Sequence, residues 1–171
     1  QLKQTSSMYD FALSGKGFFA IETPEGVQYT RNGTFSRNNQ GTLVTPLGYP
    51  VLDEGGNQID IPVTFTEPIV DASGMLRGRD ELIGVDQVLG RLQVVDFPAL
   101  YDENLKAQTP FQPVLNKGGN GYFIPQPGTL QQPSEEYEVV QGFLEEGNVE
   151  VVLEMVKMID IYRSYEADQR A

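Results

Sequence analysis

The side chains of this chain that could carry out acid–base chemistry are almost all carboxylates. Its 171 residues include neither His nor Cys. The sequence therefore holds no Ser-His-Asp or Cys-His arrangement, no thiolate metal site and no side chain whose unperturbed pKa lies near neutrality. Paired carboxylates could hydrolyse glycosides, but Trp, the usual sugar-stacking residue, is also absent. The candidate acids lie near Gly, Pro or Ser in turn-like contexts: Asp53, Asp60, Asp71, Asp96 and Asp102. We predict that the chain is not an enzyme, with no catalytic, cofactor-binding or metal-binding residues.

Two short motifs suggest ligand loops but fail the spacing that each ligand needs. Residues 53–57 (Asp-Glu-Gly-Gly-Asn) lack the alternating Asp-x-Asx-x-Asx spacing of a calcium-binding EF-hand loop. Gly15-Lys16-Gly17 is followed by Ala20 where a dinucleotide fingerprint needs a third glycine. We interpret both motifs as turns.

Exposed aromatic rings offer a different possibility, a carbohydrate-binding β module. Tyr49, Tyr101 and Tyr122 are the residues that could line such a pocket. The alternative interpretation makes them half-buried strand residues.

The charge of the chain excludes several classes of partner. There are 24 acidic and 12 basic residues, giving a net charge of −12. Nucleic-acid binding needs clustered Lys and Arg, whereas the arginines here are scattered. Anionic membrane surfaces are disfavoured for the same reason, and no apolar run approaches the roughly 20 residues of a membrane span. The sequence therefore predicts no nucleic-acid partner and no membrane insertion.

The first third of the chain is typical of short strands joined by turns. Residues 18–21 form an apolar run, 23–26 a turn, and 27–30 a return strand. Asn32-Gly33 follows, and because Asn-Gly accepts positive φ at both central positions it predicts another tight hairpin.

Similar patterns continue along the chain. Residues 35–37 and 42–44 flank an Asn38-x-x-Gly41 turn, and residues 69–70 and 75–76 flank an Asp71-x-x-Gly74 turn. A strand is expected at 90–97, one or two helical turns within 100–107, and a short strand at 122–124 inside the loop-rich stretch 110–133. The expected fold class is mainly β, an irregular β-rich domain of hairpins and short strands with a C-terminal α-helix.

The C-terminal helix is predicted from residue 149 to residue 171 by apolar spacings of three and four. Asn148 is a suitable N-cap, and no Gly or Pro follows Gly147 to stop the helix. Apolar positions cover more than half of its circumference, so one domain cannot bury them all and a second surface is implied. The predicted subunit-interface residues are Val151, Val152, Met155, Val156, Met158, Ile159, Tyr162 and Tyr165.

Two blocks of sequence resemble the bacterial flagellar rod and hook proteins. The first runs from Asp10 to Phe19 and continues in residues 29–35, 41–44 and 48–52; the second comprises residues 141–149, 154–159 and 163–167. Together they bracket nearly the whole chain, in the order that this family shows.

The resemblance implies a structural subunit of the flagellar basal body. It implies a β-rich middle domain whose terminal helices pair into a coiled-coil inner tube, so we expect a linker at 1–10 following a missing N-terminal helical segment. The β-rich core is expected at 11–140, and a turn with the start of a coiled-coil arm at 141–171. The expected partners are other copies of the chain, neighbouring rod and hook subunits and the flagellar export apparatus, and no cofactor is expected.

The expected function is a rod subunit that polymerises into a helical tube and transmits torque from motor to hook and filament, in the rod that spans the periplasm. A flagellar hook subunit is the alternative within the same family. Residues 61–141 leave little room for the outer domain that hook subunits usually insert, which favours the rod. The carbohydrate-binding module is the alternative outside this family.

Overall fold

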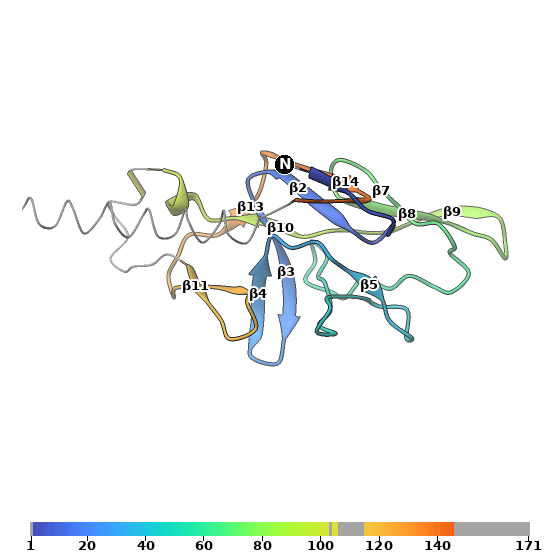
Figure 1. Ribbon diagram of the computed structural model, residues 1–171, viewed down its shortest axis with the longest axis horizontal. Coiled ribbons are helices and arrows are strands. Elements are labelled where there is room, and N and C mark those ends of the chain that lie inside the picture. The colour runs from blue at the N-terminus through green and yellow to red at the C-terminus, as the bar shows by residue number, and fades with distance from the viewer. Residues whose placement is uncertain (1, 103, 106–114, 146–171) are drawn as a thin grey trace, which may run out of the picture.

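Strands make up most of the computed structural model, which describes residues 2–102, 104–105 and 115–145 (Figure 1). The mainly β class is confirmed, because the regular elements of these residues are strands, one short 3-10 helix, η1 (Pro98–Leu100), and the two helical residues Asn104 and Leu105. The helix expected from residue 149 lies outside the described residues. Helical turns were expected within 100–107: η1 begins earlier, at Pro98, Asn104 and Leu105 are helical, and residues 103 and 106–107 are not described.

A six-stranded antiparallel sheet in the order β11-β12-β4-β3-β10-β13 lies at the centre of the fold. Its strands are β3 (Phe18–Thr23), β4 (Gly26–Thr30), β10 (Val94–Asp96), β11 (Leu115–Lys117), β12 (Phe123–Pro125) and β13 (Gln132–Pro133). The predicted hairpin at 18–30 is confirmed, with Phe19 paired to Thr30 and Thr23 to Gly26. The strand expected at 122–124 is confirmed as β12, displaced by one residue.

Two further strand pairs join residues that are far apart in the sequence. β2 (Phe11–Gly15) pairs with β14 (Tyr137–Gln141), and β1 (Leu2–Gln4) pairs with β15 (Phe143–Glu145). In Figure 1 the dark-blue start of the chain accordingly lies beside the orange strands. Residues 1–10, expected as a linker, thus contain a strand that is hydrogen-bonded to the last described residues.

The Asx turns form as predicted. β5 (Ser36–Arg37) pairs with β6 (Leu43–Val44), and Asn38 Oδ1 accepts from the backbone N–H groups of Gln40 and Thr42, both at 2.9 Å. β7 (Ile69–Val70), β8 (Met75–Asp80) and β9 (Val85–Arg91) form an antiparallel three-stranded sheet. Asp71 Oδ1 closes the β7–β8 turn, accepting from Ser73 and Met75 at 2.9 and 3.1 Å.

The hairpin predicted at Asn32-Gly33 is wrong. β4 pairs with β3 and β12, and β5 pairs with β6, so the two strands that flank this dipeptide do not pair with each other. Gly33 has no positive φ and is needed for another reason. A Cβ atom there would lie 1.6 Å from the carbonyl oxygen of Phe11, whose own N–H donates to the Gly33 carbonyl at 3.0 Å.

The strand expected at 90–97 is divided between two sheets. β9 ends at Arg91 in the three-stranded sheet, and β10 begins at Val94 in the central sheet. Leu92 and Gln93 connect them, donating backbone hydrogen bonds to Gly74 and Leu52. The prediction also missed residues 85–89, because their mixed polar and apolar order does not alternate.

The core consists of two aromatic-rich clusters of buried residues. In one, Phe19 and Phe35 meet edge to face with ring centroids 5.2 Å apart. In the other, Phe97 packs against Phe18 at 5.6 Å and Tyr29 at 5.2 Å. Since β3 contributes Phe18 to one cluster and Phe19 to the other, the central sheet separates and supports both.

Candidate assembly site

A buried arginine ties the C-terminal strand to the centre of the fold. Arg31, 9% exposed, follows β4 directly. Its Nη1 donates to the carbonyls of Gly15 and Gly17 at 2.8 and 3.0 Å, and its Nη2 donates to the Leu13 carbonyl at 2.9 Å. Nη2 also donates to Glu145 Oε2 at 2.8 Å, an ion pair with both side chains largely buried. A charge-assisted bond in such a setting is strong and directional, so β15 is fixed at its last residue.

The strand that Arg31 fixes runs alongside the N-terminal strand. Leu2 is the register partner of Glu145, and Gln4 that of Phe143. Antiparallel pairing thus places the first described residue, Leu2, opposite the last, Glu145. The two ends of the described β body therefore lie at the same edge.

Gln141 and Gly142 connect three parts of the chain just before β15. The Gln141 amide donates through Nε2 to the carbonyls of Met8 and Pro68, at 2.9 and 2.8 Å, and accepts through Oε1 from the N–H of Val70. Gly142, at φ 79°, donates to the Asp10 carbonyl and accepts from the Thr5 N–H. Every polar group of the Gln141 side chain thus serves this junction.

The predicted interface residues lie outside the described residues: Val151, Val152, Met155, Val156, Met158, Ile159, Tyr162 and Tyr165. The structure instead describes the strands that precede them in the chain, β14 and β15. Sequence reasoning missed Arg31 and Gln141 as functional residues, and counted Arg31 only as a scattered cation. A buried role for Arg31 had no local signal, since its partners come from β2, the β2–β3 turn and β15.

One group of titratable side chains surrounds the β2–β3 turn. Lys16 pairs with Glu136 at 3.2 Å and lies 5.1 Å from the centre of the Tyr101 ring. Burial raises the pKa of Asp96 above its usual range, although the N–H of Phe97 and the charge of Lys16 act in the opposite direction. Burial, helped by the charge of Asp96, raises the pKa of Tyr101 to about 12. Lys16 and Glu136 are exposed, whereas Asp96 is buried and Tyr101 is half-buried against the second core cluster, which fits a structural role.

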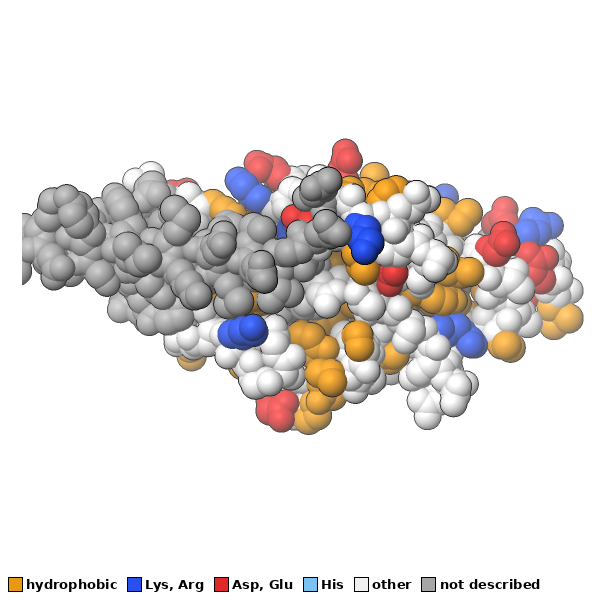
Figure 2. Space-filling view, viewed as in Figure 1, with side chains coloured by type: hydrophobic (Ala, Val, Ile, Leu, Met, Phe, Trp, Pro, Cys, Tyr) orange, Lys and Arg blue, Asp and Glu red, His pale blue; other side chains and the backbone are white. Residues whose placement is uncertain are grey.

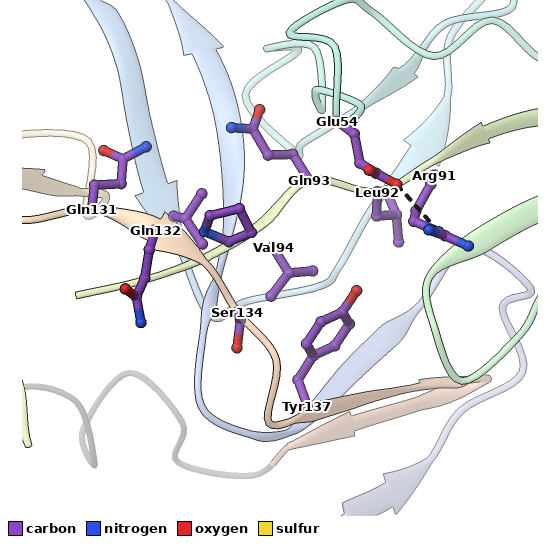
Figure 3. Close-up of a pocket in the computed structure, with 11 residues that line it drawn as sticks. Glu54, Arg91, Leu92, Gln93, Val94, Gln131, Gln132, Ser134 and Tyr137 are labelled. Atoms are coloured by element: carbon purple, nitrogen blue, oxygen red, sulfur yellow. Dashed lines mark ion pairs between the residues drawn. The ribbon is translucent and has the colours of Figure 1, made fainter. Parts of the chain in front are cut away.

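A groove of about 300 Å³, lined by both polar and apolar side chains, runs beside β10 and β13 (Figure 3). Its single carboxylate, Glu54, forms an ion pair with Arg91 at 3.2 Å. Tyr137 reaches the groove but donates its hydroxyl hydrogen bond to the Ser73 carbonyl. Glycoside hydrolysis needs two converging carboxylates, so this groove does not supply that chemistry.

The three tyrosines considered for carbohydrate binding do not form one platform. Tyr49 and Tyr122 contact each other edge to face at 6.2 Å and pack on the first core cluster. Tyr101 packs on the second cluster. All three rings pack against the core, as the alternative interpretation expected, but none lies in a strand: Tyr49 and Tyr122 lie in loops and Tyr101 in the turn after η1.

Neither a metal nor a membrane site is found in the described part of the chain. Residues 2–102, 104–105 and 115–145 contain no group of three or more carboxylates placed to hold a metal ion. Nor do the same residues include a helix with the length and apolarity to cross a bilayer.

Comparison with known proteins identifies the family. Residues 12–78 match the flagellar hook protein FlgE/F/G D1 domain, and residues 140–171 match the flagellar basal body rod FlgEFG protein C-terminal domain. Flagellar basal-body rod protein FlgF of Caulobacter vibrioides is 33% identical over 97% of this chain and 60% of its own length. FlgF of Mesorhizobium japonicum is 35% identical over 96% of the chain and 61% of its own length. This chain belongs to the FlgF/FlgG family of flagellar basal-body rod proteins.

Rod proteins named FlgG are similar as well. That of Bacillus subtilis is 32% identical over 98% of this chain and 61% of its own length. The chain thus spans about 60% of the length of these relatives. The two matched regions contain Arg31 and Glu145, the ion pair that joins them in space.

Proposed function

We propose that this chain is a structural, non-enzymatic subunit of the flagellar basal-body rod, located where the rod spans the periplasm. It polymerises with other copies and with neighbouring rod and hook subunits into a helical tube that carries torque from motor to hook and filament. Membership of the rod-protein family supports this assignment.

The observation that carries the mechanism is the pairing of β1 with β15. Leu2 and Glu145 are register partners, and Arg31 holds Glu145 through a buried ion pair. A helical arm from residue 149 onward would leave the β body beside any helical segment that precedes residue 2, as the coiled-coil tube of this family requires. Torque applied to the two arms would then reach the densely packed core through one hydrogen-bonded strand pair.

The apolar stripe of the arm supplies the contact between subunits. Each subunit binds the next through the same heterologous contact. When the rotation between neighbouring subunits does not close a ring, the subunits form a helical tube. Met155 and Met158 lie on the stripe, whereas Lys157 lies on its polar side. The arm stays unpaired until assembly, because an isolated amphipathic helix cannot bury its stripe.

Sedimentation of the full-length chain tests this mechanism. Replacing Met155 and Met158 together by Asp should leave the chain in the supernatant under conditions in which the unmodified chain pellets as polymer. Lys157→Asp is the matched control, and it should pellet normally. Normal pelleting of the double variant would rule out the stripe as the subunit seam.

A further inference from the structure

The β8–β9 hairpin ends in apolar side chains at a position where turns are normally polar. Leu82 and Ile83 occupy the tip and are 79% and 60% exposed. Val85 and Val88 on β9 are also exposed, at 47% and 58%. In Figure 1 this hairpin projects at the end of the molecule, and in Figure 2 hydrophobic side chains gather there among both kinds of charge.

The tip is held in one conformation although its side chains face solvent. Asp80 Oδ1 accepts from the N–H of Leu82 at 2.9 Å, and the Asp80 carbonyl accepts from the N–H of Gly84 at 2.7 Å. The N–H of Glu81 donates to the Thr64 carbonyl at 3.0 Å, tying the turn to a neighbouring segment. A preorganised apolar tip loses little conformational freedom when it is buried by a partner.

The base of the hairpin is supported on one face and open on the other. Phe65 covers Gly78 so closely that a Cβ there would lie 2.3 Å from the ring. On the opposite face Arg77 lies between Ile69 and Val88, its register partners on β7 and β9. Ile69 is exposed, so this face presents two aliphatic side chains with a guanidinium between them.

The outer edge of β9 offers backbone groups as well. β9 is an edge strand of the three-stranded sheet, because the strand order is β7-β8-β9 and β9 pairs with β8 on one side. Within the described ranges no other strand pairs with residues 85–89. A strand edge with unpaired N–H and C=O groups and apolar side chains is suited to association with another chain.

The charge of the hairpin selects a copy of the same chain as its partner. Residues 75–91 contain three arginines and three carboxylates, Glu81 in the turn included, and so carry no net charge, whereas the whole chain carries −12. Most contacts between two copies would therefore suffer self-repulsion. A contact through the hairpin largely avoids this cost, and Arg77 on its open face would meet an acidic neighbour.

We propose that the β8–β9 hairpin, defined by its tip residues Leu82 and Ile83 and by the edge of β9, is a second intersubunit contact that binds the β body of another copy. This inference rests on the proposed function and adds a contact between β bodies to the seam formed by the helical arms. Because the hairpin projects at the end of the molecule, away from the N-terminus whose strand pairs with β15 (Figure 1), one copy can use both contacts at once. Two contacts per subunit stiffen a tube against twisting more than one seam does.

Site-specific photocross-linking in cells that make the tagged full-length chain tests the contact. A photoreactive phenylalanine analogue is placed at position 83 or, as a matched control, at position 47, since Leu47 is similarly exposed at 56% and also occupies a turn. Irradiation should give a covalent product of two copies from position 83 and little from position 47. No product, equal products from both positions, or a product with a different protein would each overturn the inference.

Fractionation of the same cells separates this inference from the proposed function. Chain recovered in basal bodies without a two-copy product would leave the rod assignment standing and remove the hairpin contact. A two-copy product from chain that is absent from basal bodies would support the hairpin contact and remove the rod assignment. As a second measurement, Leu82→Asp with Ile83→Asp should raise the concentration needed for polymerisation on the order of 100-fold, whereas Leu47→Asp should leave it unchanged.

Discussion

Replacing Arg31 by Met should lower the free energy of unfolding by about 3–5 kcal/mol, the range found when one partner of a buried ion pair is removed. Met keeps much of the apolar stem but removes the guanidinium. The carbonyls of Leu13, Gly15 and Gly17 then lose a donor, and the Glu145 carboxylate stays largely buried without its charge partner. The bonds to Leu13 and Gly17 are buried and add to this loss.

Urea denaturation followed by far-UV circular dichroism measures this change, and the chain has no Trp that would report by fluorescence. For a chain of this size the expected loss corresponds to a fall in Tm on the order of 10 °C. Glu145→Gln should cost less, about 1–2 kcal/mol, because the amide oxygen can still accept from Arg31. Lys117→Met, which removes an exposed cation from β11, should change stability by less than about 0.5 kcal/mol.

Two outcomes would refute the reasoning. If the free energy of unfolding of Arg31→Met were within about 1 kcal/mol of that of the unmodified chain, the buried ion pair would not anchor β15. If Glu145→Gln were as damaging as Arg31→Met, the carboxylate would matter for a reason other than this pair.

Two further substitutions test individual features of the fold. Gly33→Ala should destabilise by about 3 kcal/mol or more in urea denaturation, because its Cβ would overlap the Phe11 carbonyl oxygen; Gly119→Ala, where the added Cβ meets nothing within 4 Å, is the control and should be close to neutral. Equal stabilities of the two variants would contradict the close approach. Asp96→Asn should stabilise the chain at pH 7 and lose that advantage as the pH falls toward 3.8, the ordinary pKa of an Asp carboxyl group. The sign follows because a pKa raised in the folded state makes ionisation above it a cost to folding; urea titrations at several pH values that showed no benefit at pH 7 would contradict it.

The parts of the fold that could be predicted from sequence are those set by neighbouring residues. The turns after Asn38 and Asp71 form because each side-chain oxygen accepts from backbone N–H groups two and four residues later. Asp53 does the same with Gly55 and Asn57, so the motif considered for calcium is a third turn of this kind. Such bonds depend on local chemistry alone.

The parts that could not be predicted depend on contacts between distant residues. Asn32-Gly33 has the composition of a hairpin turn, but its glycine is required by the backbone of Phe11. The end of β9 and the start of β10 lie in different sheets, although the sequence between them contains no turn signal. In both cases the deciding neighbour is far away in the sequence, and local propensity carries no information about it.

The two blocks of sequence that suggested the family are one unit in space, and this explains why they occur together. β2 from the first block pairs along its whole length with β14, which leads into the second. Arg31 and Glu145 then join the blocks again through the buried ion pair. Neither block can bury its own polar groups, because each supplies the hydrogen-bond partners of the other. In the proposed function, force passes from the arms to the body. The pairing of β1 with β15, supported by the Arg31–Glu145 ion pair at one end and by the Gln141 amide before the other, would then resist being peeled away from the core.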